Sequence, residues 1–148
     1  MPDPTVEYIY PPGMLSGDWD EKSGNRRVTV RLAGTIESEG IGETDVIKVA
    51  LSDLKTPKGQ VPGKTAVEKI KWHVNGLTAI LEWDRAPHAE IFRIDGNGEM
   101  SDGEIDWKKV GGKVDPGGDD RSGDILLTTT NTYDGNHYDI TMEIRLKD

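Results

Sequence analysis

Two segments of β-type residues lie on either side of an Asn75-Gly76 dipeptide. Asn-Gly between such segments is the strongest short-range signal of a two-residue β-hairpin, because a type I′ turn needs positive φ at both central positions. The turn fixes the register of the flanking strands, so we predict a hairpin over residues 66–83. One face of this hairpin is apolar and carries the pairs Val74–Leu77, Trp72–Ala79 and Ile70–Leu81. Cross-strand pairs contribute only roughly 0.2 to 1 kcal/mol each, so this face is expected to pack on a second sheet.

A second hairpin is predicted around Asp134-Gly135. Its register pairs Leu127 with Met142 and Ile125 with Ile144. The residues that follow the turn alternate without interruption, and the apolar parity consists of Tyr138, Ile140, Met142, Ile144 and Leu146. This pattern indicates a strand near the centre of a sheet.

Three further segments are predicted as strands. Residues 27–35 alternate with Val28, Val30 and Leu32 on one parity, residues 45–53 form a strand with Lys48 facing solvent, and residues 88–94 follow a turn at Ala86-Pro87. Segments 37–43 and 55–64 are rich in turn residues and are predicted as loops.

Residues 95–124 are the most irregular part of the chain and contain eight glycines. A structureless loop of this length would be unusual in a compact domain. We expect either a short extra hairpin with a functional loop or a surface feature that a partner orders.

These segments predict an all-β domain over residues 25–148. It would contain about seven strands and fold as an antiparallel β-sandwich or a jelly-roll-like barrel. A chain of 148 residues suits one such domain with a single core.

Residues 1–24 are predicted to form an extended arm in front of this domain. The segment contains four prolines, which fix φ and remove backbone donors, so it cannot be a central strand. Its apolar and aromatic side chains are candidate partner-binding residues: Val6, Tyr8, Ile9, Tyr10, Pro11, Pro12 and Trp19. The arm could pack as an edge strand on its own domain, reach another subunit or form a disordered tail.

Charge and cysteine content narrow the classes of function. The net charge is −9, from 27 acidic and 18 basic residues, so the average field repels nucleic acids and anionic lipid surfaces. The chain has no cysteine, so it has neither disulfides nor a thiolate site. It shows no signal-peptide pattern and no apolar window long enough for a transmembrane helix. We expect neither a nucleic-acid partner nor a membrane partner.

The acidic segment that begins at Asp95 is a candidate calcium site. Its oxygen-bearing side chains recur with a spacing similar to that of an EF-hand loop, with Asp95, Asn97, Glu99 and Asp106 as candidate ligands. Met100 stands where that loop needs glycine, Asp106 is shorter than the usual glutamate, and the flanks resemble strands. A solvated turn between strands is the simpler explanation, and the glycine-rich acidic stretch 115–124 is interpreted in the same way.

No catalytic pattern is evident, so we expect no enzymatic activity and no cofactor. His73, His88 and His137 lie in separate segments without the spacing of a zinc site, and no nucleophile elbow, phosphate-binding loop or dinucleotide fingerprint is present. The tryptophans suggest stacking on sugars, since aromatic faces contact pyranose rings. Trp72 belongs to the buried face of the first hairpin, which leaves Trp19 and Trp107 as candidates.

Four segments carry a resemblance to a known family. They are TVEYIYPPGM at 5–14, RVTVRLAGT at 27–35, IKWHVNGLTAILEW at 70–83 and GDILLTTTNTYDGNHYDITMEIRLKD at 123–148. In these segments the chain resembles small β-rich virion proteins of tailed bacteriophages, especially head decoration or cement proteins. The resemblance implies a non-enzymatic structural protein on the capsid exterior. Such a protein binds the lattice of the major capsid protein, often as a homo-oligomer, and stiffens it.

Two other functions are considered beside this one. A carbohydrate-binding module, with or without calcium bound at 95–106, would use exposed tryptophans on a β-sandwich. A phage tail or baseplate component would share the fold and differ only in its location.

Overall fold

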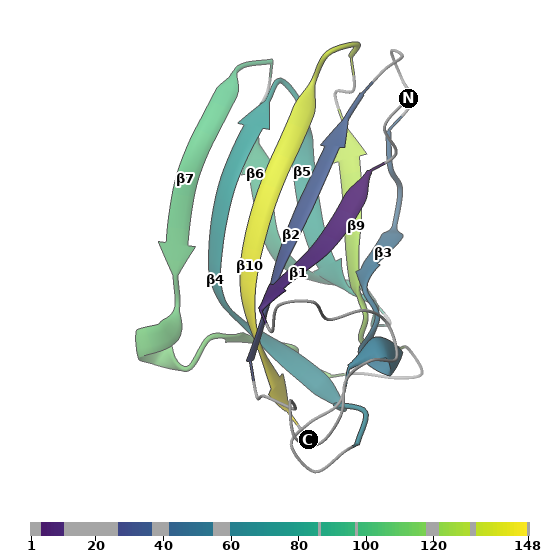
Figure 1. The fold of residues 1–148 in the computed structure, drawn as a ribbon, viewed down its shortest axis with the longest axis vertical. Coiled ribbons are helices and arrows are strands. Elements are labelled where there is room, and N and C mark those ends of the chain that lie inside the picture. The colour runs from purple at the N-terminus through teal and green to yellow at the C-terminus, as the bar shows by residue number, and fades with distance from the viewer. Residues whose placement is uncertain are drawn as a thin grey trace.

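The computed structural model of the chain describes residues 4–10, 27–36, 42–54, 60–85, 87–96, 98–117, 122–130 and 133–147. Within these ranges the chain forms ten strands and two short 3₁₀ turns (Figure 1). The strands are β1 (Thr5–Tyr10), β2 (Arg27–Thr35), β3 (Val46–Val49), β4 (Lys64–Asn75), β5 (Thr78–Trp83), β6 (Ala89–Asp95), β7 (Met100–Asp106), β8 (Lys113–Val114), β9 (Ile125–Thr130) and β10 (His137–Lys147). The 3₁₀ turns are η1 (Leu51–Asp53) and η2 (Lys108–Val110). No helix in the described residues is long and apolar enough to cross a membrane.

The strands form two antiparallel sheets that pack face to face. The first sheet has the order β1-β2-β10-β4-β7, with β8 also paired to β4, and the second has the order β3-β9-β5-β6. The pairs β2–β10, β3–β9, β4–β7 and β5–β6 together describe one long hairpin folded over on itself, with its tip between β5 and β6. Two four-stranded sheets connected in this way form a jelly roll. The predicted all-β sandwich is confirmed, with ten strands in place of about seven.

Both predicted hairpins are wrong, because each glycine turn joins strands of opposite sheets. β4 pairs with β10, β7 and β8, whereas β5 pairs with β6 and β9. The type I′ turn needs two consecutive residues with positive φ; here Gly76 has a φ of 85° and Gly135 a φ of 88°, but neither Asn75 nor Asp134 has a positive φ. The chain therefore crosses the sandwich at both turns.

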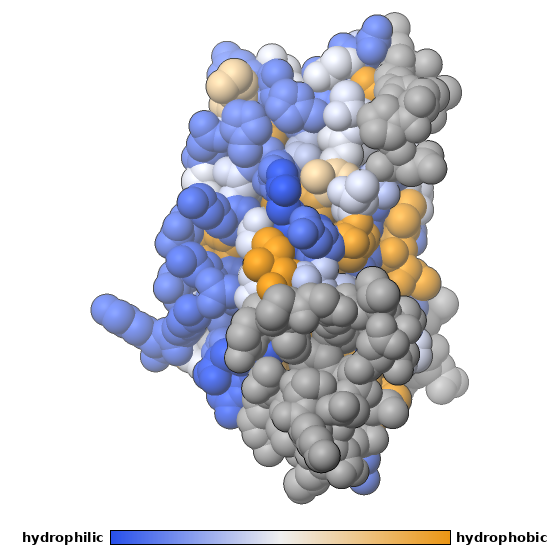
Figure 2. Space-filling model, viewed as in Figure 1, coloured by the Kyte–Doolittle hydropathy of each residue, from blue (hydrophilic) through white to orange (hydrophobic). Residues whose placement is uncertain are grey.

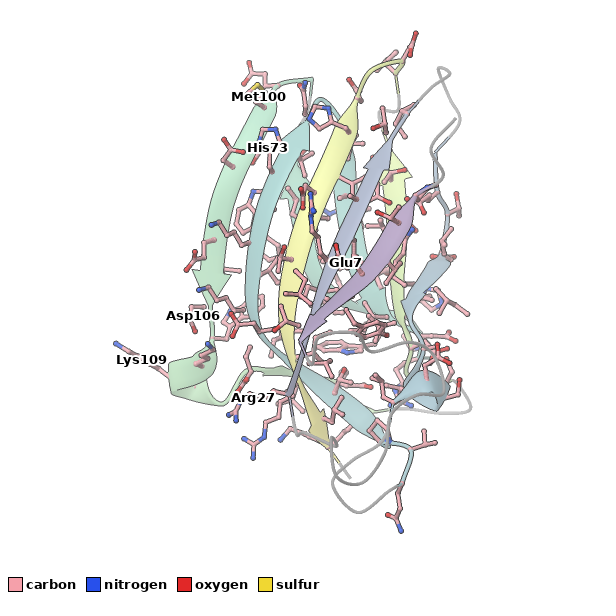
Figure 3. The ribbon with its side chains drawn as sticks, viewed as in Figure 1. Glu7, Arg27, His73, Met100, Asp106 and Lys109 are labelled. Carbon is pink, nitrogen blue, oxygen red and sulfur yellow. The ribbon has the colours of Figure 1, made fainter. Side chains whose placement is uncertain are left out.

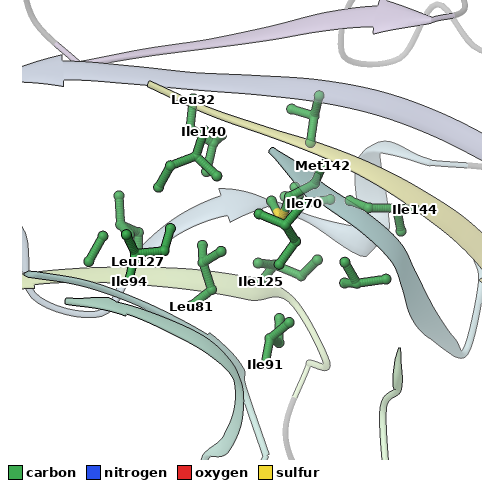
Figure 4. Packing of buried hydrophobic residues seen from close by; sticks show 14 of the residues in the cluster. Leu32, Ile70, Leu81, Ile91, Ile94, Ile125, Leu127, Ile140, Met142 and Ile144 are labelled. Atoms are coloured by element: carbon green, nitrogen blue, oxygen red, sulfur yellow. The ribbon is translucent and has the colours of Figure 1, made fainter. Parts of the chain in front are cut away.

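The buried face of each segment was nevertheless predicted correctly. Ile70 and Val74 of β4 are fully buried, as are Leu77 and Leu81 on the other side of the turn. Figure 4 shows Ile70 and Leu81 among the buried side chains between the two sheets. The alternation that would line one face of a hairpin also suits two facing sheets, because both arrangements bury every second residue. The core is a single cluster.

Lys48 does not face solvent as predicted. Strand β3 is only four residues long, and its register against β9 shifts between Ile47 and Val49. This irregularity places Lys48 in a buried position, where its Nζ binds the carboxylate of Glu43. Glu43 also accepts a hydrogen bond from the hydroxyl of Tyr138. Burial, followed by this contact, raises the pKa of Tyr138 well above its usual range.

The region 95–124 contains two strands, β7 and β8, rather than a separate hairpin. β7 extends along the edge of β4, and the chain turns through η2 before β8 rejoins the same edge. β6 and β7 lie in opposite sheets. The described glycines of this region thus lie in β7 and in the connections that precede β7, join β7 to β8 and follow β8.

Candidate functional site

One side of the sandwich is bounded by the edge strands β1 and β3 (Figure 1). β1 contains the described part of the predicted arm, and it packs as an edge strand on its own domain by pairing with β2 from Thr5–Ala33 to Tyr10–Thr29. Among the described strands, β2 is its only hydrogen-bonded neighbour. The opposite edge of β1 therefore presents backbone groups that an additional strand could pair with.

Tyr8 attaches this strand to the domain. It lies opposite Val30, whose side chain is fully buried, and it packs against the core cluster. Burial is the main cause that raises the pKa of Tyr8 to about 12, and the nearby carboxylates of Asp53 and Asp124 add to it. Tyr8 thus anchors β1 to the domain, and its role in partner binding stays a prediction.

Four apolar side chains of β1 and β3 are exposed. The exposed fractions are 39% for Val6, 44% for Ile9, 37% for Val46 and 55% for Ile47. Figure 2 shows hydrophobic residues on the part of this face where β1 and β3 lie, while the part over β4 and β7 is hydrophilic. We call these four residues the β1/β3 surface. An exposed apolar surface beside an unpaired strand edge suits contact with another protein.

The sequence predicted only half of this surface. Val6 and Ile9 were candidate partner-binding residues, whereas Val46 and Ile47 were assigned only to a strand. Two consecutive apolar residues in a strand must point to opposite faces, and this signal could have identified one of them as exposed. The side chain of Tyr10 and residues Pro11, Pro12 and Trp19 lie outside the described residues.

The other side of the sandwich, between β6 and β7, is closed by aromatic rings. Phe92 lies 5.2 Å from Trp72 and 5.9 Å from Trp107, measured between ring centroids. Lys113 covers Trp107 at 5.7 Å and donates a hydrogen bond of 2.6 Å to the carbonyl oxygen of Ile91 on β6. A lysine on a sheet edge discourages the addition of another strand. Trp107, a candidate for sugar stacking, is therefore engaged by its own protein.

The candidate calcium ligands do not come together. Asp95 ends β6 and accepts a hydrogen bond of 2.9 Å from the hydroxyl of Thr78, while Asn97 lies outside the described residues. Glu99 precedes β7 and Asp106 ends it. An extended chain rises about 3.3 Å per residue, so the two ends of β7 are about 20 Å apart. Figure 3 shows Met100 and Asp106 at opposite ends of this strand. One ion cannot contact both ends.

The two described acidic residues of the stretch 115–124 are bound within the protein. Asp115 is fully buried and forms an ion pair with Arg85. Asp124 is buried and accepts a hydrogen bond of 2.8 Å from the backbone N–H of Leu51. These carboxylates join connections at one end of the sandwich and do not form an exposed chelating loop.

A shallow depression of about 300 Å³ lies on the outer face of the first sheet. Its lining residues are Arg31, Lys71, Trp72, His73, Asp139 and Thr141. Arg31 binds Asp139 through Nε at 3.0 Å, which lowers the pKa of that carboxyl group, and His73 contacts Asp102. Arg31, Asp139 and His73 thus each bind a side chain on an adjacent strand, as is common on the wet face of a sheet.

Comparisons of the chain with protein-family models, with curated proteins and with solved structures find no match.

Proposed function

We propose that this protein is a non-enzymatic structural protein of a virion, which binds and stabilises an assembled phage capsid as a decoration protein. The observation that carries the proposal is the asymmetry of the sandwich. Both sides of the sandwich end in edge strands, but the gap between β6 and β7 is filled by aromatic rings and spanned by the hydrogen bond of Lys113 to β6, whereas β1 and β3 expose the four residues of the β1/β3 surface. The jelly roll is also an architecture of viral capsid proteins.

In this proposal the β1/β3 surface binds the lattice of the major capsid protein. Val6, Ile9, Val46 and Ile47 bury apolar area, and the free edge of β1 pairs with a segment of the capsid protein. Many copies then act on one fixed lattice, where multivalency raises the effective affinity of weak individual contacts. Self-association into a homo-oligomer would add to this effect.

The charge of the chain supports a place on the capsid exterior. A net charge of −9 repels the phosphate backbone of packaged DNA. The proposed contact needs no cofactor, since apolar burial and backbone hydrogen bonds supply the binding energy.

The test uses purified capsids of the virus that encodes the chain and measures co-sedimentation. We expect the wild-type protein to saturate a fixed number of sites per capsid, and we expect a Val6→Ser/Ile9→Ser variant to bind at least about tenfold more weakly, since about 1.4 kcal/mol of lost apolar contact gives that factor. Both residues are exposed, so these changes leave the core intact.

The matched control is a Met100→Ser/Val110→Ser variant. Both residues are exposed and apolar but belong to β7 and η2, on the opposite side of the sandwich. This variant should bind like the wild type. No binding of the wild-type protein, or an equal loss in both variants, would reject the proposal. Binding to isolated tails and not to capsids would indicate that the protein is a tail or baseplate component instead.

A further inference from the structure

We propose that His88, Asp45 and Glu82 form a binding site for Zn²⁺ on the outer face of the second sheet. This site is independent of the β1/β3 surface and does not rest on the proposed capsid function. The three side chains come from the residues before β3, from β5 and from the connection before β6. Pairing of β3 and β5 with the intervening strand β9 brings these segments together.

The ligand atoms have nearly the spacing that zinc requires. Nδ1 of His88 lies 3.8 Å from Oδ1 of Asp45 and 3.9 Å from Oε1 of Glu82, and the three ligand atoms lie within 4.8 Å of one another. Zinc binds nitrogen and oxygen at about 2.0 to 2.2 Å in a tetrahedral arrangement, so its ligand atoms are about 3.4 Å apart. Side-chain rotations close this difference by moving the ligand atoms about 0.5 Å closer to His88, and the oxygens of Asp45 and Glu82 at most about 1.4 Å closer to each other. Water would complete the coordination.

A third carboxylate, that of Asp84, lies against the other nitrogen of the imidazole. Oδ1 of Asp84 is 3.6 Å from Nε2 of His88, and Oδ2 of Asp84 accepts a hydrogen bond of 2.9 Å from the hydroxyl of Ser122. A histidine that binds zinc through one nitrogen usually donates the N–H of the other to a carboxylate, which fixes its tautomer and orientation. Asp84 is in the position of that orienting group.

Asp45 is also fixed in position by hydrogen bonds with Thr128. The hydroxyl of Thr128 lies 3.2 Å from Oδ1 of Asp45 and accepts a hydrogen bond of 2.9 Å from the backbone N–H of Asp45. Among the described residues, neither Asp45 nor Glu82 forms an ion pair with lysine or arginine. A divalent cation would therefore balance the negative charges of Asp45 and Glu82, whose carboxylates both lie near the ring of His88.

Isothermal titration of the full chain with ZnCl₂ tests this site. We expect one Zn²⁺ per chain and no comparable binding of CaCl₂, because imidazole is a ligand of zinc and not of calcium. His88→Ala and Asp45→Asn should weaken binding by more than about tenfold, and Asp84→Asn by about tenfold through loss of orientation. His137→Ala is the matched control and should leave the affinity unchanged.

Thermal unfolding gives a second readout that also reports whether each variant folds. Zn²⁺ should raise the Tm of the wild-type protein and of His137→Ala but not that of His88→Ala, because only a ligand of the folded state stabilises it. Absence of saturable zinc binding by the wild-type protein would overturn the proposal. Equal affinity in folded His88→Ala would overturn it too, as would loss of binding in His137→Ala instead.

Discussion

The side chain of Arg85 holds the buried carboxylate of Asp115 through two nitrogens. Nε lies 3.0 Å from Oδ1, and Nη2 lies 2.6 Å from Oδ2. Nη2 also donates a hydrogen bond of 3.2 Å to the carbonyl oxygen of Gly63. The hydrogen bond to Asp115 is the main cause that raises the pKa of Arg85 above its usual value. One ion pair thus joins the connections that precede β4, follow β5 and follow β8.

Removing one partner of this pair should be costly. We expect Asp115→Ala to lower the free energy of unfolding by about 3 to 5 kcal/mol, because it removes the carboxylate that binds the buried guanidinium of Arg85 through two nitrogens. Urea denaturation measures the effect. The control is Asp139→Ala, which breaks an ion pair with Arg31 between exposed side chains and should cost less than about 1 kcal/mol. Equal effects of the two substitutions would contradict a structural role for the buried pair.

Gly103 of β7 is required by the ring of Trp72. The two residues lie opposite each other on β7 and β4, and a Cβ at position 103 would lie 2.3 Å from Cζ2 of Trp72. We expect Gly103→Ala to destabilise the protein by about 1 to 3 kcal/mol, because the ring of Trp72 and the neighbouring ring of Phe92 have to shift. Urea denaturation followed by tryptophan fluorescence measures this loss.

A double variant tests the cause. Trp72→Phe in the Gly103→Ala background removes the ring atoms that meet the new methyl group. The two substitutions should therefore cost less together than the sum of their separate effects. Strict additivity would show that the close approach to Trp72 is not the reason for glycine at this position.

The titration of Tyr8 should show whether β1 is packed on the domain. Burial raises the pKa of its hydroxyl from 10.0 to about 12, so the folded state favours the neutral phenol. This contribution to stability is fully present below pH 10.0 and is lost as the pH rises through about 12. The difference in phenolate absorbance between the wild-type protein and Tyr8→Phe should appear near pH 12. A difference centred near pH 10.0 would mean that β1 is not packed on the domain.

Burial can be predicted from this sequence more accurately than the pairing of its strands. Alternation in β4 and β10 correctly identified Ile70, Val74 and Met142 as core residues. It could not identify their partners, because β2–β10 and β3–β9 pair segments far apart in the chain, and a glycine turn fits a crossing between sheets as well as a hairpin.

The candidate sites show the same limit. Val6 and Ile9 could be chosen because apolar residues near prolines suggest an arm, but nothing in the sequence indicates that β1 and β3 border the same side. The cluster around His88 is also invisible in sequence, since Asp45 reaches it only through the pairing of β3 with β9. Lys48 was misplaced because a register irregularity in a short strand leaves no signal in the alternation.

Hydrogen–deuterium exchange of the protein, free and bound to capsids, tests the role of the β1/β3 surface most directly. We predict that capsid binding protects the backbone amides of β1 and β3 from exchange, because the partner pairs with the free edge of β1 and covers both strands. The amides of β7, on the closed side of the sandwich, should exchange at the same rate in both states. Protection of β7 with no change in β1 and β3 would contradict the account.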